Sequence, residues 1–383
     1  MVMSKSTASI SQFSKEAASC KGVKAMPRAG VMTFLHNDNY GSILQAYALE
    51  RVIESLHVEV EHIDYLPSQK EKLKNMISCG NSPALILEGI RKRSAHGAQE
   101  RASAMDTFRK NRLYLSETCR THEELEKVAD RYDVLIAGSD QIWSPSWMNP
   151  AYFLDFAENI PKISYACSLG VKTMPGKKKA AKMAALLSDF QSISVREDEG
   201  AELIHKITGK EVRVLPDPVL LLTPDEWLEM AEQKEKGNGR LLCYMIGTNP
   251  SYWERVRRTA QVLELKPLVI PMTDESKEQG MEWIDGLSPE AFVGLFAGSS
   301  YVMTDSFHGA MFSTIFSKHH TVLRRYDDND KESKNSRIDQ IQRLLGYVSM
   351  DACRPDNWTA QLIADLRKQG LDYLEVAFSL AGV

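Results

Sequence analysis

The sequence predicts an α/β protein of two domains, each a parallel sheet flanked by helices. The chain has 383 residues, which is longer than one hydrophobic core usually supports. Short apolar strands alternate with helical segments, the pattern of βαβ units. A proline-rich segment at 216–227 interrupts this pattern, which then restarts. We therefore expect two α/β domains that face each other across a central cleft.

The first half opens with a βαβ unit. Residues 30–35 form an apolar strand, a loop with a glycine follows, and Ser42 is a candidate N-cap of the next helix. Residues 58–65 alternate as a second strand would. Residues 69–112 have helical periodicity and many basic side chains, which indicates a helical insertion. Further strands are predicted at 132–137, 162–166, 191–195 and 212–215, and a helix at 177–187.

The second half repeats the alternation after the prolines. Proline biases its neighbours away from helix, so 216–227 is predicted to link an N-terminal domain, 29–215, to a C-terminal domain, 228–383. Residues 1–28, rich in Ser, Ala and Lys, are predicted to be a flexible tail. The second domain is predicted to contain strands at 241–246, 266–271, 301–304 and 320–323, and helices at 252–263, 289–297 and 308–317, with closing helices at 337–345 and 356–374.

The composition excludes several classes of protein. Hydrophobic residues make up 43% and charged residues 26%, as in a globular protein. The net charge of −4 argues against nucleic-acid binding. The six cysteines are scattered singly, which indicates reduced thiols in the cytoplasm and no metal site. No apolar run has the length of a signal peptide or a membrane span.

Two polar loops follow predicted strands of the first domain. The segment His36–Ser42 precedes a helix, where free N–H groups favour an anion, and Asn39 and Tyr40 add side-chain donors. Asp140 follows the strand that ends at Ala137, at the edge where open α/β sheets bind ligands. A helix-capping turn explains the first loop equally well, and an N-cap aspartate explains the second.

Two further positions offer charge. Arg196 ends another strand and presents a fork suited to carboxylate or phosphate, although a surface pair with Glu197 is the simpler interpretation. His308 stands at a predicted helix N-terminus after the strand 301–304, where an approaching anion would favour its charged form. A buried structural histidine is the alternative.

Six segments occur in a characteristic order: TFLHNDNYGSILQAYAL, VLIAGSDQIWSP, ISYACSLG, SVRE, VLPDPVLLL and TDSFHGAMFS. In this order and spacing they resemble the polysaccharide pyruvyl transferase family, over about residues 30–346. The resemblance implies a GT-B-like architecture of two Rossmann-like domains. It also implies an enzyme that transfers the enolpyruvyl group of phosphoenolpyruvate onto sugar hydroxyls of a surface-polysaccharide precursor, which forms a pyruvate ketal and releases phosphate.

The resemblance assigns roles by motif. Asp140 matches the catalytic acidic residue, Arg196 an anion-binding arginine, and His308 the histidine of the second domain. Several family members have Arg-Leu-His where this chain has Ser306, Phe307 and His308, so an arginine that would bind the donor is missing. The expected donor-binding residues are Arg196, Ser306, Phe307, His308 and Gly309, with Arg324, Arg325 or Arg337 supplying the missing charge. The expected acceptor or cleft residues are Asn39, Tyr40, Gly41, Gln45, Ser139, Gln141 and Trp143.

The expected reaction needs an acid, a base and groups that hold anions. Asp140 is assigned proton transfer near the sugar, while His308 and Arg196 hold the donor; His308 as the acid is the alternative. No cofactor and no metal are expected, since phosphoenolpyruvate is itself a substrate. The acceptor in such pathways is commonly lipid-linked, which would place a cytoplasmic enzyme at the inner face of the plasma membrane.

Three alternatives stay open at this point. The basic, apolar segment 84–105 either docks peripherally on anionic lipid or packs as an ordinary helix of the first domain. The same two-domain fold also serves nucleotide-sugar glycosyltransferases, because fold does not fix function. A catalytically silent ligand-binding protein, which lost turnover with the arginine at Ser306, is the third interpretation.

Overall fold

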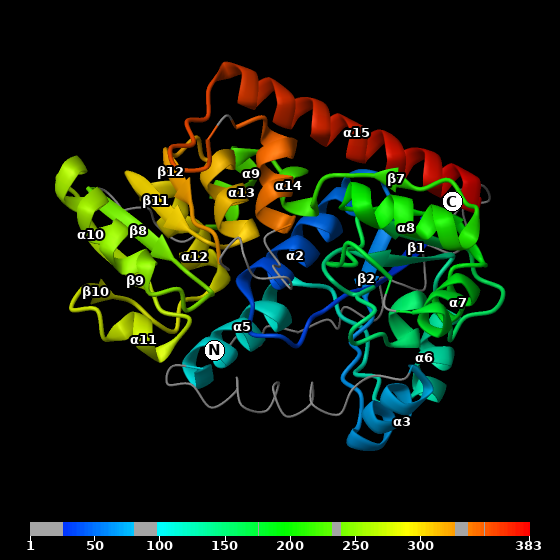
Figure 1. Ribbon diagram of the computed structural model, residues 1–383. Helices are drawn as coiled ribbons and strands as arrows, with labels where there is room; N and C mark the ends of the chain where they lie inside the picture. The colour runs from blue at the N-terminus through cyan, green and yellow to red at the C-terminus, as the bar shows by residue number, and fades with distance from the viewer. Residues whose placement is uncertain (1–25, 80–97, 175, 232–238, 326–335, 348) are drawn as a thin grey trace, which may run out of the picture.

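The computed structural model describes residues 26–79, 98–174, 176–231, 239–325, 336–347 and 349–383. Most of the predicted tail and residues 80–97 of the predicted insertion lie outside these ranges. The described residues form two five-stranded sheets, one in each half of the chain, and a two-stranded sheet. The two halves lie side by side, with helix α15 across the top of both (Figure 1).

The first sheet is parallel throughout, with strand order β2-β1-β3-β4-β5. Its third strand, Val-Leu-Ile-Ala-Gly, is buried at every position, as expected of a parallel strand covered by helices on both faces. The strands are β1 (Arg28–Met32), β2 (Glu59–His62), β3 (Val134–Gly138), β4 (Lys162–Tyr165) and β5 (Phe190–Ser192). The helices of this half are α2 (Tyr40–Ser55), α3 (Gln69–Cys79), α5 (Ala98–Arg112), α6 (His122–Ala129), η3 (Pro150–Phe153), α7 (Lys177–Leu186) and α8 (Asp198–Thr208).

The second sheet is also parallel, with order β10-β9-β8-β11-β12, the order of a Rossmann half. Its strands are β8 (Arg240–Tyr244), β9 (Lys266–Ile270), β10 (Glu282–Trp283), β11 (Tyr301–Thr304) and β12 (His320–Val322). Its helices are α10 (Ser251–Leu263), α11 (Asp274–Lys277), α12 (Pro289–Gly298), α13 (Phe307–Ile315), α14 (Ser336–Leu345) and α15 (Asn357–Ala381). The GT-B-like α/β architecture expected from the sequence is confirmed.

The segment predicted to be a linker is folded, and residues 216–222 of it are buried. It contains the short 3₁₀ helix η4 (Pro218–Leu220) and the helix α9 (Pro224–Met230). Proline is tolerated at the first turn of a helix, and Thr223 and Glu226 form a capping box there, so α9 begins where the prolines suggested an interruption. Trp227 of α9 is fully buried, and its indole N–H donates to the carbonyl of Val219 at 3.1 Å.

Two further predicted elements differ in their limits. The predicted strand 191–195 is divided into β5, which pairs with β4, and β6 (Ser194–Val195), which pairs with β7 (Arg213–Val214). The chain leaves β4 because the N–H of Ser194 donates to the Ser164 hydroxyl at 2.8 Å instead of to a ladder carbonyl. Helix α2 starts at Tyr40, with Asn39 as its N-cap, so the predicted cap Ser42 lies inside the helix.

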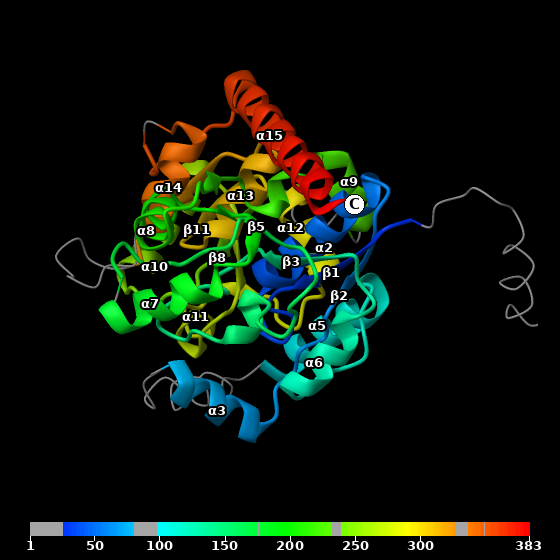
Figure 2. The ribbon, with the colours of Figure 1, turned by 90° about the vertical axis from the view of Figure 1, so that its right-hand side faces the viewer.

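One hydrophobic core joins the two halves. It includes side chains of both sheets together with α2, α12, α13 and α15. Helix α15 returns along the top of the molecule to the first sheet, as the view turned by 90° also shows (Figure 2). There the Tyr373 hydroxyl donates to the Ser164 carbonyl at 2.8 Å. The carboxyl ends of the two sheets are therefore held in a fixed relation to each other.

Candidate functional site

The candidate site is formed by loops at the carboxyl ends of both sheets. The strand order reverses direction between β1 and β3 in the first sheet and between β8 and β11 in the second. Ligands of open α/β sheets bind beside such switch points. Ser42 lies in the first turn of α2, which follows β1, and Asp140 lies in the loop after β3, while β11 leads directly into α13 with His308.

Asp140 is held in place by a short hydrogen-bond network. It has a left-handed backbone, with φ of 66°, and only 9% of the residue is exposed. One carboxylate oxygen accepts the N–H of Gln141 at 2.8 Å, and the other accepts a short hydrogen bond from the Ser42 hydroxyl. The amide of Asn37 donates to that hydroxyl at 3.0 Å. Ser42, predicted as a helix cap, therefore orients Asp140.

His308 faces a buried aspartate from the segment between the sheets. Its Nε2 lies 3.5 Å from Oδ2 of Asp217, which is fully enclosed, while one tenth of the histidine side chain stays exposed. The other oxygen of Asp217 accepts the N–H of Val219 at 3.1 Å. An aspartate that is fixed in this way can orient an imidazole and stabilise its protonated form.

Arg196 completes this buried cluster. Its guanidinium bonds Oδ2 of Asp217 at 2.5 Å, and Nε lies 3.9 Å from Glu197. The ring of Phe307 stacks on the guanidinium with a separation of 4.6 Å. Burial alone would lower the pKa of Arg196, but the carboxylates of Asp217, Glu197 and Asp140 raise it above its ordinary value. The Arg196 guanidinium therefore keeps its positive charge inside this cluster.

The structure places Arg196 and Phe307, two expected donor-binding residues, in contacts within the protein. Only 2% of the Arg196 side chain is exposed, so its fork is occupied by the protein and does not face a donor. The simple surface pair that was the alternative for Arg196 is not found either, because the pair is buried. Phe307, expected to contact the donor, instead packs against Arg196 and against the ring of His308. Both residues position the His308 and Asp217 side chains.

The same neighbours set the ionisation of Asp217. Burial acts to raise the pKa of its carboxyl, but His308 and Arg196 outweigh this effect and lower the pKa to about 2. Asp217 is therefore a carboxylate at neutral pH. A fixed negative charge therefore lies beside Nε2 of His308.

The start of α13 is organised by side chains that the sequence analysis assigned to the donor. Ser306 is the N-cap, and its hydroxyl accepts the N–H of Gly309 at 3.3 Å. A Cβ on Gly309 would lie 2.4 Å from the Thr304 hydroxyl, so glycine allows the helix to approach β11. Ser306 and Gly309 are both buried, which makes capping and close packing their roles in this structure.

Arg325 lies beside the start of α13. Its Nε is 3.2 Å from Oδ2 of Asp305, and Nη2 donates to the Asp305 carbonyl at 3.0 Å. Asp305 is itself buried, and its carboxylate accepts the N–H groups of Ile246 and Gly247 at 2.6 and 2.7 Å. About a quarter of the Arg325 side chain remains exposed. It thus places a cation next to Ser306, the position of the missing arginine.

The other two basic candidates are less well placed by the described contacts. Arg324 is exposed, and its carbonyl accepts the Tyr252 hydroxyl at 3.2 Å. Arg337 belongs to α14, but its side chain lies outside the described part of the chain.

The two halves meet where α2 begins. A Cβ on Gly41 would lie 1.9 Å from Nδ1 of His308, so the imidazole rests directly on the backbone of the first half. Next to it, the Tyr40 ring stacks on Phe292 of α12 at 4.3 Å, and its hydroxyl donates to the Leu287 carbonyl at 3.0 Å. This contact fixes His308 against the first turn of α2, which also contains Ser42.

Gly41→Ala is expected to force the His308 ring away from Asp217. Inserting a methyl group into a packed site typically costs about 1 to 3 kcal/mol in the free energy of unfolding. Urea denaturation of the variant measures this loss. Gly200→Ala is the matched control, because a Cβ on Gly200 would make contacts of 3.4 Å or longer. Equal stabilities of the two variants would contradict the contact described here.

Several residues expected to contact the acceptor are enclosed instead. Gln45 is fully buried and bonds Thr33 and the N–H of Ser139 at 3.0 Å each, so it holds the loop before Asp140. The buried Ser139 hydroxyl donates to the Ala166 carbonyl at 2.6 Å. Trp143 stacks on Phe153 in the core and is fully buried. Tyr40 is also core.

The remaining acceptor candidates lie closer to the surface. Asn39 accepts the N–H of Gly41 at 2.9 Å as the cap of α2. Gln141 is half-buried, and its amide nitrogen approaches Gly170 so closely that a Cβ there would lie 1.6 Å away. Three of the acceptor candidates therefore lie next to Asp140 or His308: Asn39, Gly41 and Gln141. The other four lie in the interior and support those residues: Gln45, Ser139, Trp143 and Tyr40.

Sequence reasoning missed Asp217 and Asp305 as parts of the site. Asp217 lies between Pro216 and Pro218 in the segment interpreted as a linker, although an aspartate that follows a strand is a signal for a ligand edge. Asp305 directly follows β11, but the sequence analysis gave it no role and assigned the chemistry of this segment to His308. Both act through residues from distant segments, which local patterns do not reveal.

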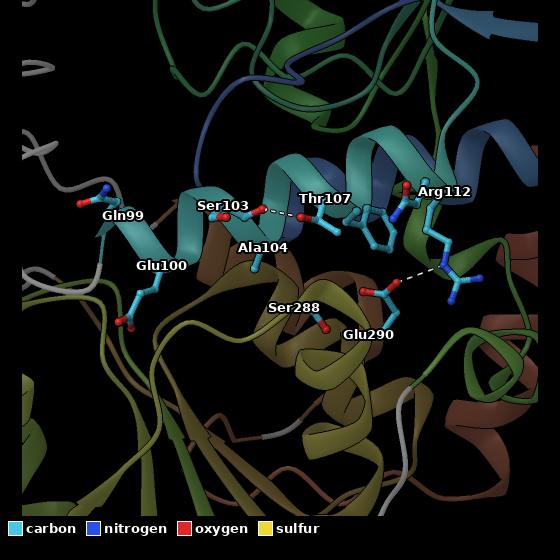
Figure 3. A pocket seen from close by; sticks show the side chains of 10 residues that line it. Gln99, Glu100, Ser103, Ala104, Thr107, Arg112, Ser288 and Glu290 are labelled. Carbon is cyan, nitrogen blue, oxygen red and sulfur yellow. Dashed lines mark hydrogen bonds and ion pairs between the residues drawn. The ribbon is translucent and has the colours of Figure 1, made fainter.

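A separate hollow lies between α5 and the start of α12 (Figure 3). Its volume is about 1000 Å³, and Ser103 and Thr107 of α5 point into it opposite Ser288 and Glu290. Arg112 forms an ion pair with Glu290 at 3.0 Å at one end. Neither Asp140 nor His308 lines this hollow.

Two further searches concern metals and membranes. In the described ranges, no group of three or more His, Cys, Asp or Glu side chains has the arrangement of a metal site. Among the helices that the structure describes, none has the length and apolar character to cross a membrane.

Comparisons with known proteins agree with this class of fold. The family model described as polysaccharide pyruvyl transferase matches residues 39–327, which is most of the chain and includes Asp140, Asp217 and His308. The chain belongs to this family. No curated protein is a significant match in sequence.

Several solved structures have a similar fold. A protein described as a candidate UDP-N-acetylglucosamine 2-epimerase from Listeria monocytogenes is 12% identical, with a TM-score of 0.50 over 94% of this chain and 91% of its own. The UDP co-structure of MnaA from S. aureus is 12% identical, with a TM-score of 0.49 over 93% and 91%. An alpha-glucosyltransferase in complex with UDP is 8% identical, with a TM-score of 0.46 over 91% and 95%. At these identities the likeness concerns the fold alone.

Proposed function

We propose that this protein transfers the enolpyruvyl group of phosphoenolpyruvate onto two hydroxyls of a saccharide, forming a pyruvate ketal and releasing phosphate. The family match supports the class of reaction. The observation that carries the proposal is the placement of His308, held by the ionised Asp217, at the carboxyl edge where Asp140 also lies.

The reaction needs one proton delivered to carbon and two removed from hydroxyls. Protonation of the donor's methylene carbon produces an oxocarbenium-like centre, which the first sugar hydroxyl attacks as it loses its proton. The C–O bond to phosphate then breaks, and the second hydroxyl closes the ring and loses its proton. An acid and a base at fixed positions are therefore required, and each contributes about 10²- to 10⁴-fold in rate.

In our proposal His308 is the acid and Asp140 the base. The fixed carboxylate of Asp217 stabilises the imidazolium that donates the proton, as an aspartate does for a catalytic histidine. Asp140 forms no ion pair within the described residues, although its charge helps to raise the pKa of Arg196. Its carboxylate accepts hydrogen bonds from Ser42 and from the N–H of Gln141. A carboxylate that is held in place by hydrogen bonds is suited to accept a proton from a sugar hydroxyl.

The donor's anionic groups would meet the start of α13 and Arg325. The N-terminus of a helix favours a phosphate or carboxylate, and α13 begins one residue before His308. Arg325, whose guanidinium contacts Asp305 next to Ser306, would supply the charge that the missing arginine provides elsewhere in the family. Because Arg196 is enclosed, it supports Asp217 and does not bind the donor in this proposal.

We assign the acceptor saccharide to the hollow beside α5. The hollow beside α5 presents hydroxyl and amide groups from Ser103, Thr107 and Asn111, which suit the hydroxyls of a saccharide chain. We place the part of the acceptor remote from the reacting sugar there. The described cysteines are free thiols, which supports our placement of the reaction in the cytoplasm.

Thermal unfolding with phosphoenolpyruvate tests the donor. A ligand at one hundred times its dissociation constant stabilises a protein by about 2.7 kcal/mol, so the unfolding temperature should rise with phosphoenolpyruvate and not with uridine or guanosine diphosphate. Arg325→Ala should lower this rise, because a charge-assisted contact is lost. Arg131→Ala, which breaks an exposed ion pair in the first half, serves as the control. Stabilisation by a nucleotide alone would instead favour the glycosyltransferase.

A further inference from the structure

We propose that the outer end of the second half docks on an anionic phospholipid surface through a hollow beside α10. The hollow has a volume of about 640 Å³ and lies between α10 and the segment 351–354. Tyr301 and His319, at the amino ends of β11 and β12, form its floor. In Figure 1, α10 is the outermost element of this half, at the left of the molecule.

Positive charge surrounds this hollow. Arg255 and Arg258 of α10 and Arg354 on the opposite wall line it, and all three are exposed. Arg255 bonds Asp351 at 2.5 Å, which neutralises one of these charges. Neither Arg258 nor Arg354 forms an ion pair with an acidic side chain in the described part of the chain, so two cations remain for an anionic partner.

Apolar side chains extend the same stripe of α10. Val262 is 73% exposed and Leu263 is 41% exposed, and both line the hollow. Residues 255, 258, 259 and 262 follow the three- and four-residue spacing of one helix face. A free phosphate ion would need only the arginines, whereas a lipid surface also buries apolar groups that lie beside basic ones. This combination favours a membrane over a soluble anion.

The position of the hollow is compatible with catalysis at the other end of the sheet. It lies at the amino ends of β11 and β12, while His308 and Asp305 follow the carboxyl end of β11. A surface bound at the amino ends would leave the carboxyl edge uncovered. The docking surface therefore differs from the segment 84–105 considered from the sequence, of which 84–97 lie outside the described residues.

Sedimentation with vesicles tests the proposal. The wild-type protein should sediment with vesicles of equal parts phosphatidylglycerol and phosphatidylcholine at low salt, and not with phosphatidylcholine alone. Each basic residue near such a surface is worth roughly a fivefold change, so Arg258→Gln with Arg354→Gln should weaken binding about 30-fold. Arg131→Gln with Arg213→Gln removes two exposed arginines of the first half and should have little effect.

Three outcomes would overturn the proposal. The first is failure of the wild-type protein to sediment with the anionic vesicles. The second is an equal loss of binding in the control pair, which would indicate only general charge attraction. The third is unchanged vesicle binding in Val262→Ser with Leu263→Ser, which would indicate a simple anion site. These results do not depend on the reaction at His308, so the proposed function is tested separately.

Discussion

Replacement of His308 by glutamine is expected to lower turnover by about 10²- to 10⁴-fold, the usual contribution of a positioned proton donor. Glutamine keeps a polar group beside Asp217 but cannot deliver a proton to carbon. Asp217 also keeps its pairing with Arg196, so the variant should remain folded. Phosphate release from phosphoenolpyruvate, with a saccharide acceptor on which the wild type turns over, measures the effect.

Two comparisons make this result specific. His205→Gln changes an exposed histidine of α8 and should leave turnover unchanged.

Asp140→Asn should also lose turnover, because an amide cannot accept the proton of the sugar hydroxyl. Wild-type rates in His308→Gln would remove the histidine from the proposed mechanism and leave Asp140 as the acid. A loss in His308→Gln that is explained by unfolding would be visible in its circular dichroism.

Asp217→Asn is expected to destabilise the protein by about 3 to 5 kcal/mol. The change removes the carboxylate charge that pairs most closely with the Arg196 guanidinium. The buried guanidinium then has Glu197 as its remaining acidic neighbour, at the longer distance of 3.9 Å. Breaking a buried ion pair on one side is costly because the remaining charge stays out of water. Urea unfolding at neutral pH measures the loss. Glu117→Gln breaks the exposed pair with Arg131 and should cost less than about 1 kcal/mol.

The stability difference between the wild type and Asp217→Asn is also expected to depend on pH. The pKa of Asp217 is lowered from its ordinary value of 3.8 to about 2 in the folded protein. A lowered carboxyl pKa adds stability that is present above the ordinary value and is lost as the pH falls through the folded value. The shift corresponds to about 2 kcal/mol. The stability gap between wild type and Asp217→Asn should therefore narrow between about pH 4 and pH 2, and a constant gap would contradict this cause.

Local patterns predicted the elements but not all of their partners. The strand 301–304 was predicted with the limits that the structure gives to β11, because apolar strands between turns carry a clear local signal. Helix α9 was missed, because its capping box at Thr223 was outweighed by the prolines around it. The start of α2 was misplaced by three residues, because Asn39 and Ser42 are both acceptable caps and only the fold distinguishes them.

The sequence by itself determined the fold class, the family and the two strand ends that Asp140 and His308 follow, because these depend on order and spacing along the chain. Only the tertiary structure decided which polar groups meet. Asp217 reaches His308 and Arg196 from a different segment, and burial turns Arg196 and Trp143 into supporting residues. The physical reason is that desolvation and ion pairing depend on the surroundings in space, and residues distant in sequence create those surroundings.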